Sequence, residues 1–191
     1  GLGAIIVALA LDHTSGFLVI PLAIGGAALF GAIWAGIPGW LQAKRGSHIV
    51  ITTIMFNFIA SALMIFMLNR FLKAPTSNGL ESRVLEQAAW MPQLRSFMPI
   101  FGHSPVNLSL FLALLLLVGF WLLVWRTRFG YALRTMGQNP TASLYAGMSN
   151  ERLIIITMTI SGALAGLVAV NQILGVNHRL VENFVAGYGF V

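Results

Sequence analysis

The sequence predicts an all-α protein that crosses a lipid bilayer several times. Its 191 residues are 58% hydrophobic and only 8% charged, with a mean hydropathy of +0.85, whereas a soluble domain carries roughly a quarter charged residues. The apolar residues also occur in long blocks and not in the stripe that an amphipathic helix shows on a soluble core. Lipid is therefore the expected environment, and a single transmembrane domain over residues 1–191 is the simplest division.

Four stretches are long enough to cross the membrane, because a helix rises 1.5 Å per residue through about 30 Å of hydrocarbon. They are residues 17–41, 49–72, 108–125 and 153–176, and Arg70 is the one charged residue within them. Residues 1–11 are apolar but too short, so we expect the tail of a further span. The chain starts without Met and stops as the sequence turns apolar again, which predicts a fragment of a longer protein.

The connections between these stretches predict the orientation. Residues 42–48 form a tight basic turn with Lys44 and Arg45, residues 126–152 are again basic, and residues 73–107 are long and contain prolines. Short cytoplasmic loops are enriched in Lys and Arg, so the two basic connections are expected inside and the long one outside. The eleven cations form no stripe, which explains the net charge of +6 by membrane topology and argues against a nucleic-acid partner.

Small residues recur at four-residue spacing in the first and fourth stretches. This spacing lets helix backbones approach closely in lipid, so the ladders are interpreted either as packing seams or as hinges that flex during transport. The ladders are Ala28/Ala32/Gly36, Gly31/Ala35/Gly39 and Gly162/Gly166.

No catalytic, metal or cofactor site is predicted on this chain. The four histidines lie apart without ligand spacing, there is no cysteine, and the acidic residues all fall outside the apolar stretches, so neither a metal site nor an intramembrane proton relay is indicated. The dipeptide Gly-Lys of a phosphate-binding loop is missing as well. If ATP drives the protein, another chain must bind it.

Amide and hydroxyl side chains remain inside the apolar stretches. Thr53 and Asn57 lie in the second stretch, and Asn171 and Gln172 lie near the outer end of the last. In lipid such groups must find partners. Two interpretations stay open: interhelical hydrogen bonds, or the lining of a pathway for a small polar, uncharged solute.

The basic connection 126–152 contains a predicted short helix. Asn139 is a good N-cap for a helix that starts at Pro140, and Gly147 can end it in a left-handed conformation. The two-turn helix of residues 140–146 is too short to span the membrane, and Asn150 and Glu151 start the next span. We expect either a knob that a soluble partner contacts or an ordinary interfacial connector.

At this connection the sequence resembles the permease family of ABC importers for simple sugars, nucleosides and branched-chain amino acids. The motifs that carry the resemblance to the family's ATPase-docking loop are Arg128-Phe129-Gly130, Leu133-Arg134, Gly137-Gln138-Asn139-Pro140 and Tyr145-Ala146-Gly147-Met148, followed by Ser161-Gly162-Ala163-Leu164-Ala165-Gly166. Three others resemble the nucleoside and simple-sugar branch: Gly36-Ile37-Pro38-Gly39, Thr52-Thr53-Ile54-Met55-Phe56-Asn57 and Gly187-Tyr188-Gly189-Phe190. Thr135, Met136 and Ser143 depart from the small or aliphatic residues expected in the docking loop.

The resemblance implies a permease subunit in the cell inner membrane. Its partners would be a second permease subunit, ABC ATPase subunits that bind ATP, and an external solute-binding protein. The ATPase-coupling helix would comprise Asn139, Pro140, Thr141, Ala142, Ser143, Leu144, Tyr145, Ala146 and Gly147. The solute is expected to be a nucleoside or simple sugar, with a branched-chain amino acid as an alternative.

Two other functions remain as alternatives. An ATP-independent carrier or channel predicts a charged ring, a carbonyl filter or an intramembrane ion site, and no such pattern is visible in the sequence. A membrane scaffold that transports nothing predicts that residues 139–147 tolerate scrambling.

Overall fold

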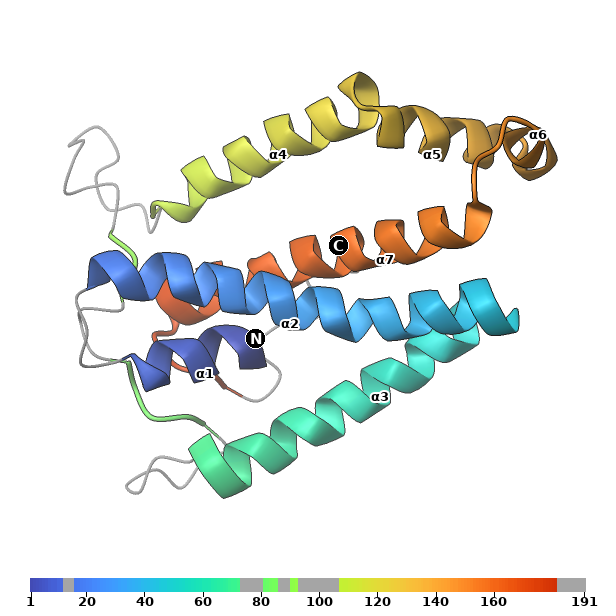
Figure 1. Cartoon of the computed structure of the whole chain (residues 1–191). Coiled ribbons are helices and arrows are strands. Elements are labelled where there is room, and N and C mark those ends of the chain that lie inside the picture. The colour runs from blue at the N-terminus through green and yellow to red at the C-terminus, as the bar shows by residue number, and fades with distance from the viewer. Residues whose placement is uncertain (12–15, 73–80, 86–89, 93–106, 182–191) are drawn as a thin grey trace.

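The computed structural model describes residues 1–11, 16–72, 81–85, 90–92 and 107–181. The elements of these described residues are helices, shown in Figure 1, and an antiparallel bridge joins Glu81 to Val181. The motif at 187–190 lies outside the described residues. The elements in chain order are α1 (Leu2–Ala10), α2 (Gly16–Arg45), α3 (Ile49–Met67), η1 (Leu68–Leu72), α4 (Ser109–Arg126), α5 (Arg128–Gln138), α6 (Pro140–Tyr145), α7 (Asn150–Val170) and η5 (Asn171–Val176).

The four predicted spans are confirmed as helices that are long and apolar enough to cross a membrane. These helical segments are Leu18–Arg45, Ile49–Leu72, Ser109–Arg126 and Asn150–Val176. The second and fourth end in the π-helical turns η1 and η5. The predicted alternation also holds, since residues 46–48 and α6 lie at one end of the molecule and residues 81–85 and 90–92 lie at the other (Figure 1).

One helix boundary differs from the sequence-based prediction, and another confirms it. The turn expected over residues 42–48 is shorter, because α2 continues to Arg45 and the chain reverses at Gly46 with a φ of +64°. The helix α7 begins at Asn150, as the sequence predicted, three residues before the apolar stretch starts. In both places polar residues extend a helix beyond its hydrophobic part, so hydropathy underestimates the helix length.

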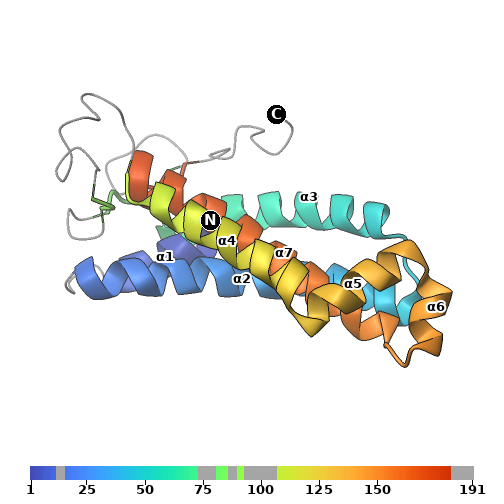
Figure 2. The same cartoon turned by 90° about the horizontal axis from the view of Figure 1, so that it is seen from above.

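The helices α2 and α7 lie side by side along most of their length (Figures 1 and 2). A Cβ atom built on Gly31 would overlap the Gly162 carbonyl, and one on Gly166 would overlap the Ala27 carbonyl. Gly39 lies directly against Met158. The ladders Gly31/Ala35/Gly39 and Gly162/Gly166 are therefore confirmed as a packing seam.

The buried core lies toward the end opposite α6. There α1 packs on the first half of α2, with Gly3 against Gly26. Fully buried side chains of α1, α2, α7 and η5 meet in one cluster that includes Ile5, Val19, Val170 and Ile173. By contrast, neither α3 nor α4 contains a buried residue, and both diverge from the central pair in Figure 1.

Candidate functional site

The corner between α4 and α5 is built by a threonine cap and a glycine. The Thr127 hydroxyl accepts a hydrogen bond from the Gly130 backbone N–H over 3.1 Å and donates to the Leu123 carbonyl over 2.5 Å. A Cβ on Gly130 would overlap the Leu123 and Val124 carbonyls. The glycine thus allows α5 to turn back directly against the end of α4.

The helix α5 is a feature that the sequence analysis missed. Its 11 residues mix basic, polar and apolar side chains, so no apolar block marks this helix in the sequence. The Arg134 guanidinium lies 4.5 Å from the centre of the Trp125 ring, a cation–π distance. This contact ties α5 to the last turn of α4 and fixes where α6 starts.

The predicted N-terminus of α6 is confirmed. The Asn139 side chain accepts hydrogen bonds from the backbone N–H groups of Thr141 (3.0 Å) and Ala142 (3.1 Å), and Pro140 is the first helical residue. Two of the N–H groups that a helix start leaves free are thereby satisfied. Asn139 itself has an extended backbone, with φ −152° and ψ 102°, so the chain changes direction between α5 and α6.

The predicted C-terminus of α6 is confirmed within one residue. The helix ends at Tyr145, and Gly147 has a φ of +77°, a left-handed conformation that favours glycine. The Gly147 N–H donates to the Leu144 carbonyl (2.9 Å) and the Met148 N–H donates to the Ser143 carbonyl (3.0 Å). This pattern is a Schellman motif, so both ends of α6 are fixed by local chemistry.

The end of α6 presents two apolar side chains to solvent. Tyr145 is 90% exposed and Leu144 is 57% exposed. The helix lies at the same end of the molecule as the 46–48 turn and is not buried between the long helices (Figures 1 and 2). A soluble partner can therefore reach it from outside the membrane-spanning region.

A polar contact that the sequence analysis missed joins α6 to α7. Ser143 is 0% exposed, its hydroxyl donates to Oδ1 of Asn150 over 2.6 Å, and Nδ2 of Asn150 donates to the Pro140 carbonyl over 3.0 Å. We call the Ser143, Asn150 and Pro140 contact the amide clamp. The sequence signal for it is weak, because Asn150 also fits a simple helix start.

An ion pair lies beside this clamp. Nζ of Lys44, in the last turn of α2, is 2.6 Å from Oε2 of Glu151, in the first turn of α7. Both side chains are about half exposed, so the pair contributes at most about 1 kcal/mol. Its position extends the α2–α7 seam to the end that carries α6.

The two pathway-lining candidates on α3 differ in whether their polar side-chain groups are free to bind a solute. The Thr53 hydroxyl already donates within its own helix, to the Ile49 carbonyl at 2.9 Å with the Val50 carbonyl at 3.0 Å. Asn57 is exposed, and its carboxamide has no hydrogen-bond partner within the described residues. Asn57 is therefore the stronger candidate for contact with a polar solute.

Asn171, a third candidate, forms part of a polar cluster at the other end. Its Oδ1 accepts from Nδ2 of Asn107 (3.1 Å) and from the Ser109 hydroxyl (2.9 Å), and Ser109 is also hydrogen-bonded to Oδ1 of Asn107. A Cβ on Gly175 would overlap Nδ2 of Asn107. The cluster joins the start of α4 to η5, and Gln172 lies half-buried beside it.

Comparison with known proteins identifies the family. The model of the family described as branched-chain amino acid transport system / permease component matches residues 1–191. The chain belongs to this family. It is thus an ABC transporter permease component of the cytoplasmic membrane and is not itself catalytic. No solved structure matches it.

Three relatives of this permease carry names that include a solute. It is 31% identical over 176 residues to the glucose ABC transporter permease protein of Haloferax volcanii, 35% over 183 residues to the guanosine ABC transporter permease protein of Bacillus subtilis, and 34% over 174 residues to a nucleoside ABC transporter permease protein of Lactococcus lactis subsp. cremoris. These alignments cover 90%, 91% and 88% of this chain, but 46%, 49% and 46% of the relatives. The chain spans about half the length of the curated relatives it matches.

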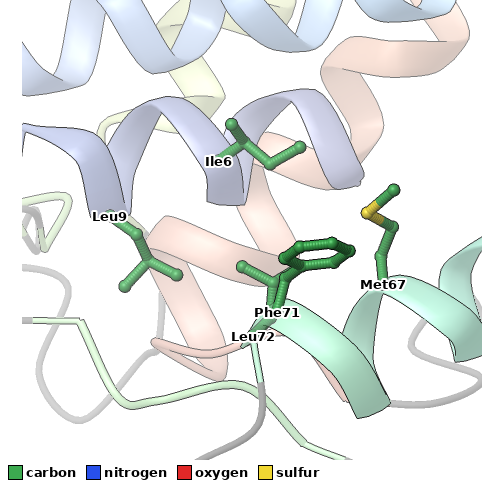
Figure 3. A pocket seen from close by; sticks show the side chains of 5 residues that line it. All are labelled: Ile6, Leu9, Met67, Phe71 and Leu72. Atoms are coloured by element: carbon green, nitrogen blue, oxygen red, sulfur yellow. The ribbon is translucent and has the colours of Figure 1, made fainter.

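An apolar pocket of about 340 Å³ opens between α1 and the end of the second span of the permease. Ile6 and Leu9 face Met67, Phe71 and Leu72 across it (Figure 3). The described side chains that line it are all apolar, so they match a hydrocarbon chain and offer a nucleoside or a sugar no hydrogen-bond partner. Within the described residues no group of three His, Cys, Asp or Glu side chains is placed to hold a metal ion.

Proposed function

We propose that this permease chain forms part of the translocation pathway of an ATP-driven importer, with α6 as its ATPase-coupling helix. In this proposal the helix and its caps, residues 139–147, contact a cytoplasmic ABC ATPase. A second permease subunit and an external solute-binding protein complete the transporter. ATP binds to the ATPase subunits and biases the permease between two states through contacts that differ between them.

The exposed end of α6 is the observation that carries this proposal. A six-residue helix is too short to be stable alone in water, yet α6 is capped at both ends and presents Leu144 and Tyr145 outward. Exposed aromatic side chains on a rigid support are typical of contact sites for protein partners. The family membership supplies the kind of partner, since the ATP site of an ABC system is not on this chain.

The coupling role is tested by Tyr145→Asp in the full-length transporter reconstituted in liposomes. A carboxylate at the contact should lower solute uptake and solute-stimulated ATP hydrolysis about 10-fold or more, because central aromatic contacts contribute about 2 kcal/mol or more to an interface. The exposed His48→Asp variant, at the same end of the molecule, should behave as wild type. Unchanged uptake and hydrolysis in Tyr145→Asp would remove the coupling assignment.

A nucleoside or simple sugar is the proposed solute. The names of the similar permeases support this class, and an exposed carboxamide at Asn57 matches the hydroxyl and amide groups of such solutes. The test is to measure ATP hydrolysis stimulated by guanosine, glucose, pentoses and leucine in the purified full transporter. Stimulation by leucine alone would overturn the proposed class, whereas guanosine or glucose stimulation that weakens in Asn57→Leu would support both class and lining.

An ATP-independent carrier or channel makes a different prediction in the same liposomes. Solute would equilibrate across the membrane without the ATPase subunits, whereas the proposed importer accumulates solute only when ATP and the ATPase are present. This comparison separates the two functions without any mutation.

A further inference from the structure

The short helix α6 has two different attachments to the rest of the chain. On one side it follows α5 through Asn139, whose extended backbone makes the connection a single-residue bend. On the other side the amide clamp holds it against the first residue of α7. Apart from the Asn139 cap, the side-chain hydrogen bonds that bind α6 to other described elements run to Asn150.

The clamp depends on the paired donor and acceptor of one carboxamide. Oδ1 of Asn150 takes the single proton of the Ser143 hydroxyl, while Nδ2 donates to the Pro140 carbonyl. The Ser143 oxygen also lies 2.7 Å from the Pro140 carbonyl, so the three groups form one compact network around a fully buried hydroxyl. The Asn150 carboxamide can do both at once because it donates and accepts through two different atoms.

The helix on the far side of the clamp is part of a rigid pair. Gly162 packs on Gly31, and Gly39 packs on Met158, so α7 contacts α2 by backbone-to-backbone approach along the membrane. The Lys44–Glu151 ion pair continues this contact to the level of α6. Close-packed elements move together and do not deform continuously.

We infer that Asn150 is a positioning residue that makes α6 move with α7 and α2 as one body. The inference rests on the proposed coupling role of α6 and adds the route by which a displacement of this helix enters the membrane. A push on Leu144 and Tyr145 passes through the Ser143–Asn150 contact to α7 and then through the glycine seam to α2. Motion through Asn139 alone would instead bend the chain at the end of α5.

The decisive variant is Asn150→Ala in the full-length transporter with its ATPase and solute-binding protein. In this variant the Ser143 hydroxyl can still donate to the Pro140 carbonyl, so α6 keeps its own hydrogen bonds and loses only its tether. We expect the ratio of solute taken up to ATP hydrolysed to fall about 3- to 10-fold, the factor that one net hydrogen bond contributes to an equilibrium, with ATP hydrolysis retained. The matched control is Ser149→Ala, since the Ser149 side chain makes no cap hydrogen bond.

Asn150→Asp is a second variant, chosen because it should leave the start of α7 stable. A carboxylate at the first residue of α7 is favoured by the helix dipole, and it still accepts from Ser143, but it cannot donate to Pro140. It should lower the same ratio, by less than Asn150→Ala does. A ratio equal to wild type in both variants would overturn the inference.

A readout that needs neither ATPase nor solute accompanies these assays. Spin labels at Thr141→Cys and Arg152→Cys, both exposed positions, report the distance between α6 and α7 in the purified full-length permease with any other cysteines replaced. The distance distribution should be narrow in the labelled parent and broad after Asn150→Ala; an unchanged distribution would refute the clamp. If Tyr145→Asp has no effect, the proposed coupling role of α6 fails. If Tyr145→Asp loses coupling but Asn150→Ala behaves as wild type, only the route through Asn150 is rejected.

Discussion

Individual polar residues decide how the helix ends are fixed in this molecule. Asn139 caps α6, Thr127 caps α5, and Asn171 holds Asn107 and Ser109 together at the opposite end. Each side chain satisfies groups that lipid or a protein interior would leave without water. These polar side chains thus hold the helix ends in place.

His178 is a residue whose protonation is linked to the folded structure. Its ring stacks on Trp90 at 4.0 Å between centroids. Burial lowers the pKa of His178 from its usual 6.5, and the nearby Leu174 backbone opposes this shift only in part. The folded state therefore binds this proton less readily than the unfolded state.

The sign of the pH effect follows from this difference. Stability from neutral His178 is fully present above about pH 6.5 and is lost as the pH falls from there toward the lower folded-state pKa, because the unfolded state takes up more protons. We expect the unfolding temperature of the full-length permease to drop between about pH 7.5 and about pH 5.5, and His178→Gln to lose part of that drop. The exposed His48→Gln is the control, and an identical drop in wild type and His178→Gln would contradict the prediction.

Residue-level predictions from sequence succeeded where the chemistry is local. Asn139, Pro140 and Gly147 were predicted from caps that act within four residues, and the structure confirms them. The Ser143–Asn150 contact joins residues on two different helices. Its geometry depends on how the 146–149 turn folds, which no propensity specifies.

At the scale of elements, the α2–α7 pair is the structural axis of the chain. Around Gly31 and Gly162 both helices carry glycine or alanine, so backbone atoms meet without large side chains between them. In lipid such contact relies on packing and not on the hydrophobic effect. Any added side-chain volume along the seam must push the helices apart.

This geometry predicts the effect of Gly162→Ala. A Cβ at this position would overlap Ala35 and the Gly31 carbonyl, and overpacking of this kind costs about 1–3 kcal/mol. The measurement is unfolding of the full-length permease in detergent micelles. Gly119→Ala, on α4, is the matched control because nothing lies within 4 Å of its added Cβ. An equal change in the free energy of unfolding in the two variants would show that the seam is not tightly packed.

The long helices were predicted from hydropathy alone, but α5 was not. A 20-residue apolar block has one stable solution in lipid, a helix. The segment Arg128–Gln138 mixes basic, aromatic and small residues, and its helix depends on the Thr127 cap and on the space that Gly130 leaves at the α4 corner. The space beside Gly130 exists only once α4 and α5 have formed their corner.

At the scale of the whole molecule, α3 and α4 leave large apolar faces uncovered. Phe58 is 71% exposed and Leu115 is 68% exposed, and neither helix contains a buried residue. Such faces require lipid or further helices around them. This arrangement agrees with a chain that spans about half the length of its relatives.

The orientation of the molecule is testable in intact cells. With α6 facing the cytoplasm, a membrane-impermeant thiol reagent should label Val84→Cys and leave Thr141→Cys unlabelled until the cells are opened. The reason is that the segment 81–85, which contains Val84, and α6, which contains Thr141, lie at opposite ends of the spans (Figure 1). Phe58→Cys should resist the reagent in both conditions, and labelling of Thr141→Cys in intact cells would reverse the proposed orientation.

The sequence by itself determined the class of this protein: apolar blocks of membrane length form helices, and caps with fixed spacing mark a short helix between two of them. Those features act within one segment, so composition and local propensity suffice. The tertiary structure alone decided that α2 pairs with α7, that Asn171 is bound to the start of α4, and that Asn150 holds α6. These contacts join different helices, and their geometry depends on how those helices pack and turn, which a linear pattern does not record.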